Sequence, residues 1–205
     1  MGLAKPKTKP SYTFEEYLAI DRETDECYEY LDGEIYLMAG ESGAHGDISM
    51  NVAVIFGNQM KETNCRGRIK DTKVLSGAAT QKTSSPKGMF SYPDLVVICG
   101  QPQYPDKHED VIVNPQIIVK VLSESTESFD RGEKFIRYRM WNPTLTDYLL
   151  VSQNAPLVEH YAKQPDESWV LREYHGLQTS LTIETINATL NLADIYDRIE
   201  FETNE

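Results

Sequence analysis

Apolar residues recur at two different periods along the chain, and these periods predict where helices and strands lie. Apolar residues follow Thr13 at helical spacing, and Thr13 with Glu16 matches a capping box, so a short helix is expected there. A second helix is predicted over residues 45–60, where apolar side chains share one helical face. Between them, residues 27–38 alternate on both sides of an Asp-Gly pair, which predicts a tight hairpin.

Three apolar runs in the middle of the chain predict strands at 68–76, 92–99 and 116–122. A helix capped by Ser125 or Thr126 is expected after the third strand. The segments TDYLLVSQ, LVEHYAK and WVLREYH then alternate as an antiparallel meander, and LADIYDRI predicts a short closing helix. This order lacks the regular strand–helix alternation of a TIM barrel or a doubly wound sheet. We therefore expect one α/β domain with a mixed sheet.

The composition is typical of a soluble globular protein, with 40% hydrophobic and 25% charged residues in a chain of 205. No apolar run approaches the roughly 18 residues of a membrane span, and the opening MGLAKPKTKP lacks the apolar stretch of a secretory signal. Cys27, Cys65 and Cys99 are odd in number, widely spaced and without a CxxC pair. We expect a cytoplasmic protein with no membrane partner, no disulfide and no zinc site.

The net charge of −12 excludes a protein that coats nucleic acid through a broad basic face. The charge is uneven, however, because residues 61–87 carry seven basic side chains against two acidic ones. This basic segment has two interpretations: a solvated hairpin edge or a short nucleic-acid contact. In the second interpretation the contacting residues are Arg66, Arg68, Lys70 and Lys73.

The candidate chemistry centres on a lysine in a strand that is otherwise apolar. Lys120 stands inside the run IIVKVL, and burying an unpaired ammonium costs several kcal/mol, so the fold must supply an anion. Asp94 is a candidate, at the mouth of the preceding apolar strand. On the next helix Asp130 and Lys134 lie at i and i+4, a spacing that stabilises an exposed pair by only about 0.3–0.5 kcal/mol. The sequence has no glycine-rich phosphate loop, GxSxG or HExxH motif.

Several motifs occur together in the order YPD, NPQIIVKVLSEST, DRGEK and DYLLV. With the N-terminal YLDGEIYLMAG and the final LADIYDRI, they make the chain resemble the Uma2 family of restriction-endonuclease-like proteins, in the PD-(D/E)xK nuclease superfamily. The resemblance spans residues 12–201 and implies a single restriction-endonuclease-like domain, with a mixed β-sheet flanked by helices. It leaves a flexible N-terminal segment, 1–11, and an acidic tail, 202–205.

The resemblance implies a metal-dependent endonuclease that hydrolyses phosphodiester bonds of nucleic acid, DNA foremost. Two carboxylates on neighbouring strands would hold Mg²⁺ or Mn²⁺, and a lysine would orient water or stabilise charge on the phosphate. The family pattern assigns Asp94 as metal ligand, Lys134 as catalytic lysine and Asp130 as its neighbour. Glu34 and His45 are expected to line the same cleft, and a homodimer is consistent with the family.

One position departs from the family pattern. Lys120 stands where the family has its second metal-binding glutamate, so we expect its ammonium to pair with Asp94 in place of the metal and to weaken cation binding. In that case the two strands are neighbours and the ion pair lies within about 4 Å. Glu124, four positions along, is the candidate replacement for the missing carboxylate.

Three hypotheses about this substitution stay open. The first is an impaired nuclease in which Lys120 or Lys134 is the catalytic lysine. The second is a catalytically inactive nuclease-fold protein that binds nucleic acid or a protein partner. The third is a lysine that extends from a strand edge to solvent, with no site at all.

Overall fold

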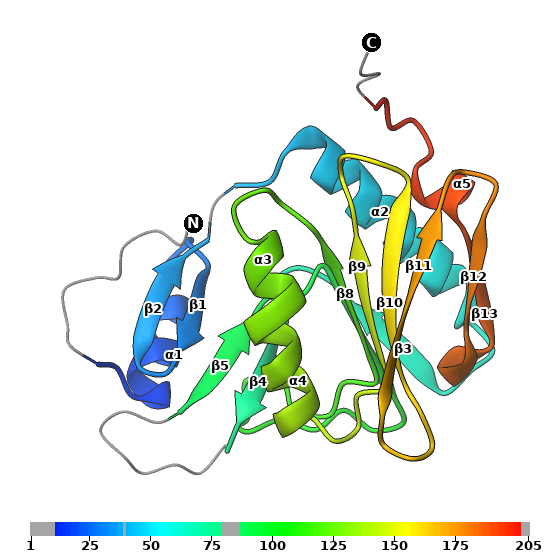
Figure 1. Ribbon diagram of the computed structural model, residues 1–205. Helices are drawn as coiled ribbons and strands as arrows, with labels where there is room; N and C mark the ends of the chain where they lie inside the picture. Colours follow the sequence, from blue (N-terminus) through cyan, green and yellow to red (C-terminus); the bar gives the residue numbers. More distant parts are fainter. Residues whose placement is uncertain (1–10, 39, 79–86, 202–205) are drawn as a thin grey trace.

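Two main β-sheets and a small hairpin organise the fold, with helices packed on their faces (Figure 1). The computed structural model describes residues 11–38, 40–78 and 87–201. The predicted flexible segment, apart from Ser11, and the predicted acidic tail lie outside these residues. The expected mixed α/β architecture in one domain is confirmed.

The larger sheet has six strands in the order β11-β10-β9-β8-β6-β3. β8 and β9 are parallel and every other neighbouring pair is antiparallel, so the predicted meander is present as β9, β10 and β11. The strands are β3 (Cys65–Arg68), β6 (Leu95–Cys99), β8 (Ile117–Val121), β9 (Asp147–Val151), β10 (Leu157–Lys163) and β11 (Trp169–His175).

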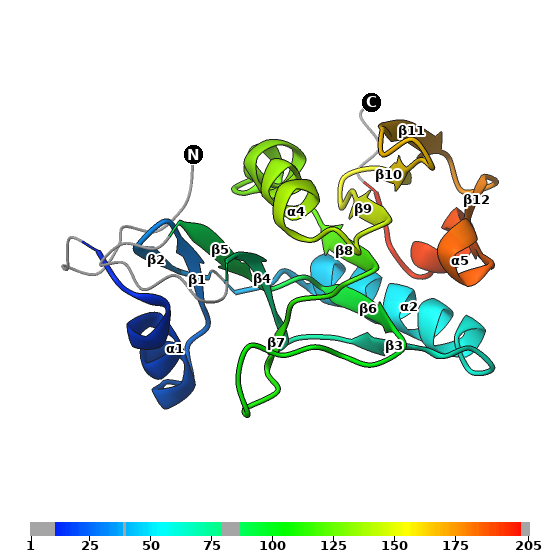
Figure 2. The same ribbon diagram turned by 90° about the horizontal axis from the view of Figure 1, so that it is seen from below.

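β8 lies in the interior of this sheet, and its side chains alternate between two apolar cores. Alternate residues from Ile117 onward pack with α2 (Gly43–Gln59), which lies behind the sheet in Figure 1. Those from Ile118 onward face the core of α4 (Phe135–Trp141), on the opposite side (Figure 2). The helix that carries α4 begins with α3 (Glu127–Phe129) and passes through a π-helical turn, η1 (Asp130–Lys134).

The second sheet has five strands in the order β2-β1-β5-β4-β7, and α1 (Phe14–Glu23) packs against it. The predicted hairpin is confirmed: Asp32 and Gly33 have φ values of 47° and 99°, as a two-residue turn of this kind requires. The strands are β1 (Tyr28–Leu31), β2 (Glu34–Leu37), β4 (Lys73–Gly77), β5 (Gly88–Ser91) and β7 (Val111–Ile112).

The start of α1 also follows the sequence pattern. Thr13 Oγ1 accepts a hydrogen bond from the Glu16 backbone N–H at 3.2 Å, and Glu16 accepts one from the Thr13 N–H at 2.9 Å. The predicted capping box is therefore confirmed, and it satisfies two backbone donors that helix formation leaves free.

One predicted strand is divided in the structure, and one hairpin was not predicted. The segment 68–76, expected as one strand, contains the end of β3 and most of β4, which belong to different sheets. The chain changes direction between them, and Lys70 there has a φ of 47°. A hairpin of β12 (Ser180–Ile183) and β13 (Ala188–Asn191) precedes the short closing helix α5 (Leu192–Ile195), and the sequence pattern missed it.

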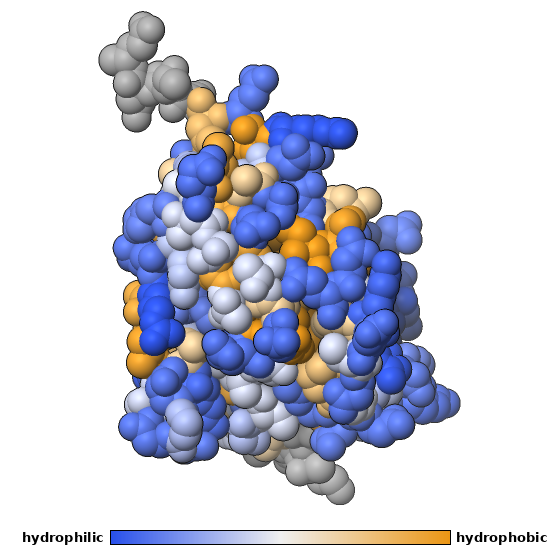
Figure 3. Space-filling view, turned by 90° about the vertical axis from the view of Figure 1, so that its right-hand side faces the viewer, coloured by the Kyte–Doolittle hydropathy of each residue, from blue (hydrophilic) through white to orange (hydrophobic). Residues whose placement is uncertain are grey.

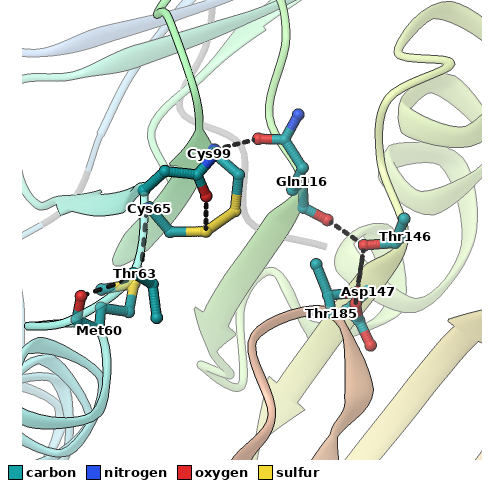
Figure 4. The surroundings of a disulfide bond; sticks show 9 residues. Met60, Thr63, Cys65, Cys99, Gln116, Thr146, Asp147 and Thr185 are labelled. Carbon is teal, nitrogen blue, oxygen red and sulfur yellow. Dashed lines mark hydrogen bonds between the residues drawn. A yellow bond between two sulfur atoms is a disulfide. The ribbon is translucent and has the colours of Figure 1, made fainter.

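The expectation of no disulfide was wrong. Cys65 and Cys99 are bonded to each other, and Figure 4 shows the bond with Gln116 accepting from the Cys99 backbone N–H at 2.5 Å. The two cysteines are 34 residues apart in sequence but directly opposed in the antiparallel register of β3 and β6. Strand register, which spacing along the chain does not reveal, brings them together.

No helix among the described residues is long and apolar enough to cross a membrane. The side of the molecule that carries β12, β13 and α5 shows separate apolar patches among hydrophilic side chains (Figure 3).

Candidate active site

Asp94 lies on the short connection between β5 and β6, where the chain passes from one sheet to the other. Its carboxylate accepts a hydrogen bond from the Val121 backbone N–H at 2.6 Å and lies 2.8 Å from Nε2 of His45. The Lys120 ammonium lies 3.2 Å from Oδ2 and 3.4 Å from Oδ1 of the same carboxylate. The expected pairing of β6 with β8 and the expected ion-pair distance are both confirmed.

The charge state of Asp94 follows from these contacts. Burial alone would raise the pKa of its carboxyl, but the Lys120 charge and the hydrogen bonds from His45 and Val121 outweigh burial and hold the pKa below its usual value. Asp94 is therefore an anion at neutral pH. Its side chain is 8% exposed and that of Lys120 is 10% exposed, so the pair is buried.

Lys120 belongs to β8, between β6 and β9 in the sheet, and it is 8% exposed as a residue. Its ammonium also lies 3.4 Å from the Tyr92 carbonyl oxygen, which accepts a hydrogen bond from it. The hypothesis of a strand-edge lysine that reaches solvent is therefore wrong.

His45 is oriented from both sides. Ser42 caps α2 by accepting the His45 backbone N–H at 3.1 Å, which places the imidazole in the first turn of the helix. The side-chain amide N–H of Gln153 points at Nδ1 of His45 from 3.4 Å, so Nδ1 accepts and Nε2 carries the proton toward Asp94. This tautomer makes His45 a donor to the carboxylate.

Lys134 forms a second buried ion pair in the same region. Its ammonium lies 2.8 Å from Glu29 and 3.1 Å from Asp130, and the lysine is only 2% exposed. Burial alone would lower the pKa of Lys134, but these two carboxylates outweigh it and raise the pKa above the usual value. The interpretation of Asp130 and Lys134 as an exposed helix pair is therefore wrong.

The sequence prediction missed Glu29 in this network, as it missed Glu41 beside Asp94. Glu29 sits in β1 between Tyr28 and Tyr30, which are both buried, and is itself 8% exposed. The backbone N–H of Tyr92 donates to Glu29 at 3.2 Å, while the Tyr92 carbonyl accepts from Lys120. Tyr92 thus joins the two ion pairs. In the sequence Glu29 is flanked by two tyrosines, which is a weaker form of the signal that marked Lys120, a charge within an apolar run.

A pocket of about 370 Å³ opens beside these charges. Most of its lining residues are polar. They include residues 123–127 and 152–154, together with Glu29, His45, Lys120 and Lys134. A second pocket, of about 810 Å³, includes Asp94. The two pockets share four lining residues, Leu37, Met38, Gly40 and Glu41, so they meet at this point.

Glu34 lies away from this centre. It is exposed on β2, where the Tyr36 hydroxyl donates to its carboxylate, and it lines neither pocket. Glu34 was expected to line the cleft. Glu29 and Tyr36, which are cross-strand neighbours in the hairpin, line the smaller pocket instead. Glu124 is exposed at the rim of the smaller pocket.

The four basic residues proposed for nucleic-acid contact differ in environment. Arg66 and Lys70 are exposed, whereas Arg68 donates to the Tyr104 hydroxyl at 2.5 Å. Lys73 is 4% exposed, with its ammonium 2.8 Å from Asp21 and 3.1 Å from Asp110. The prediction for Lys73 was wrong, because two carboxylates distant in sequence bury and neutralise its charge.

The donor set around Asp94 decides which cation fits. A site made by two facing carboxylates does not fit, because the charged group of β8 that faces Asp94 is the ammonium of Lys120. A mixed site fits better: one ligand atom each from Glu41, His45 and Asp94 lie within 4.8 Å of one another, and a bound cation would replace the Nε2 proton that His45 donates to Asp94. Imidazole with carboxylate oxygens suits Mn²⁺ and Zn²⁺ better than Mg²⁺, which prefers oxygen ligands alone.

The chain is similar to a known protein family and to two proteins of one cyanobacterium. The model of the Uma2 family, described as "Putative restriction endonuclease", matches residues 14–193. Two proteins of Synechocystis sp., named as uncharacterized proteins slr1290 and sll1609, are 34% and 31% identical. Their alignments cover 96% and 80% of this chain and 95% and 88% of their own lengths.

A solved structure shares the fold. A "putative nuclease belonging to DUF820" from Anabaena variabilis superimposes with a TM-score of 0.72 and 13% sequence identity. The match covers 92% of this chain and 99% of that one. At this identity the similarity concerns the architecture alone.

Proposed function

The chain belongs to the Uma2 family, and from this membership together with the Asp94 centre we propose a metal-dependent phosphodiesterase that acts on nucleic acid, DNA foremost, with activity held low by Lys120. The observation that carries the proposal is the position of Asp94, between His45 on one side and Lys120 on the other. Perturbed, buried charges that line a pocket are typical of catalytic sites.

In this proposal Asp94, His45 and Glu41 hold a divalent cation such as Mn²⁺. Bound there, the cation would supply Lewis acidity and lower the pKa of water. Lys120 faces the pocket beside Asp94, where its ammonium stabilises negative charge on a phosphate. Lys134 also lines this pocket, and its contacts with Glu29 and Asp130 hold its ammonium in one place.

Lys120 also explains why the activity is low. At 3.2 Å and an effective dielectric constant near 20, one unit-charge interaction is worth about 5 kcal/mol. A divalent cation near Asp94 is attracted less strongly, because the Lys120 ammonium already neutralises part of the carboxylate charge. The ammonium also repels the cation directly. A glutamate at position 120 would reverse both effects, because it would add a second anion beside the cation.

A second candidate function rests on the same ion pair. If Lys120 neutralises Asp94 so completely that no cation binds, the protein retains only a nuclease fold that binds nucleic acid or a protein partner. The variant Lys120→Glu separates this function from an impaired enzyme, because the substitution increases cleavage only if the other catalytic groups are intact.

The experiment compares the natural chain, Lys120→Glu and Lys120→Glu/Asp94→Ala, each with Mn²⁺ or Mg²⁺, on plasmid DNA, single-stranded DNA and RNA. We expect weak cleavage by the natural chain, stronger cleavage by Lys120→Glu and none by the double variant. An inactive Lys120→Glu variant that still folds would refute the enzymatic proposal and favour the binding module.

A further inference from the structure

The larger pocket, of about 810 Å³, carries apolar side chains that are exposed to solvent. Leu37, Met50 and Ile69 are 40%, 63% and 49% exposed, and all three line it. They come from three separate parts of the chain: β2, α2 and the bend between β3 and β4. The pocket is therefore an apolar recess that adjoins Asp94 directly.

Polar groups surround this recess at its rim. Asp25, Glu26 and Asp71 are exposed carboxylates of its lining, and Lys70 is an exposed cation there. Carboxylates accept hydrogen bonds from exocyclic amino groups such as those of nucleobases, and they repel phosphate. The recess thus combines an apolar wall with acceptors at its edge.

The charge of the surrounding surface opposes a continuous duplex. A duplex presents two phosphate strands, and its binding depends on several lysine or arginine contacts that neutralise them. Of the four residues proposed for nucleic-acid contact, Lys73 is buried by carboxylates and Arg68 is held by Tyr104, which leaves Arg66 and Lys70 exposed. Lys61 and Lys87 are the other exposed cations in the described part of the basic segment. Single strands also expose their bases, which gain free energy by stacking on aromatic side chains or by entering pockets with apolar walls.

We propose that the recess receives an unpaired nucleobase next to the phosphodiester held at Asp94, so that the preferred substrate is single-stranded nucleic acid. This inference rests on the proposed function, since it places the phosphate at the candidate cation site. The volume lies within the range of about 300–1,000 Å³ that small-molecule pockets occupy. In this arrangement the base would lie in the recess and the phosphate would lie toward Lys120 in the smaller pocket. The two pockets meet at the residues that they share, Leu37, Met38, Gly40 and Glu41.

The test measures binding, so it does not depend on cleavage. Fluorescence anisotropy compares a labelled 20-nucleotide single-stranded DNA with the duplex of the same sequence, with Mn²⁺ at low salt. We expect tighter binding of the single strand. Met50→Glu should weaken that binding by about 5- to 150-fold, the range that corresponds to loss of one stacked base.

A matched control separates the recess from the general effect of added charge. Val54 lies one turn further along α2, is 53% exposed and does not line the recess, so Val54→Glu adds the same charge outside it. We expect Val54→Glu to bind as the natural chain does. A 2-aminopurine placed within the strand should change its fluorescence on binding to the natural chain but not to Met50→Glu.

The outcomes distinguish the two proposals. Equal or tighter binding of the duplex would overturn this inference and leave the proposed function standing. Equal effects of Met50→Glu and Val54→Glu would also overturn it, since the recess would then serve another occupant such as a protein segment. Absence of binding to either nucleic acid would overturn the proposed function itself.

Discussion

Removal of the Asp94 carboxylate should destabilise the protein strongly. In Asp94→Ala the Lys120 ammonium, 8% exposed as a residue, keeps only the Tyr92 carbonyl at 3.4 Å as a described partner. The variant also loses the acceptor for the Val121 N–H and for His45. Breaking a buried pair on one side costs about 3–5 kcal/mol, which for a domain of this size lowers the melting temperature by roughly 6–20 °C.

The assay is thermal and urea unfolding with EDTA present, so that metal binding does not contribute. Asp94→Ala/Lys120→Met removes both charges and should regain most of the lost stability, because no buried ion is then left without a partner. Glu124→Ala, an exposed carboxylate at the rim of the same pocket, should change stability by less than about 0.5 kcal/mol. An unchanged or raised midpoint for Asp94→Ala would refute the reasoning.

Three further predictions concern other parts of the molecule. Glu29→Gln should lower stability by about 1–3 kcal/mol in urea unfolding, since Lys134 loses the closer of its two carboxylates, and an unchanged midpoint would contradict this. The pKa of Asp110 is lowered to about 2, because Arg22 and Lys73 outweigh burial; its stabilisation is therefore present above pH ~4 and lost as the pH falls toward 2. Melts of Asp110→Asn and the natural chain should accordingly converge near pH 2. Reduction of the Cys65–Cys99 disulfide, which closes a loop of 34-residue separation, should cost about 4 kcal/mol, whereas Cys65→Ser should not respond to reductant.

The sequence predicted the elements whose signals are local. The capping box at Thr13 and the Asp32–Gly33 turn depend on neighbouring residues, and both are present as expected. Lys120 was also detectable, because a charge inside an apolar run needs a partner wherever the strand lies. Its pairing with Asp94 followed from that requirement and from the family pattern, and the structure contains it at 3.2 Å.

The sequence did not predict features that depend on strand register or on distant partners. The disulfide requires Cys65 to oppose Cys99 across two strands, which no spacing rule specifies. Lys73 looked like one of several surface cations because its partners, Asp21 and Asp110, lie far away in sequence. Glu29 was missed because a strand that alternates toward solvent has the same local pattern as one whose carboxylate enters a buried network.

The central claim is that the ammonium of Lys120 pairs with Asp94 and thereby weakens the binding of a divalent cation. Calorimetric titration with Mn²⁺ tests it directly on the natural chain, Lys120→Met and Lys120→Glu. The account predicts weak binding by the natural chain, an intermediate affinity for Lys120→Met and a gain of at least roughly 100-fold for Lys120→Glu, given about 5 kcal/mol per unit-charge contact at 3.2 Å. Binding of Mn²⁺ by the natural chain as tightly as by Lys120→Glu would contradict it.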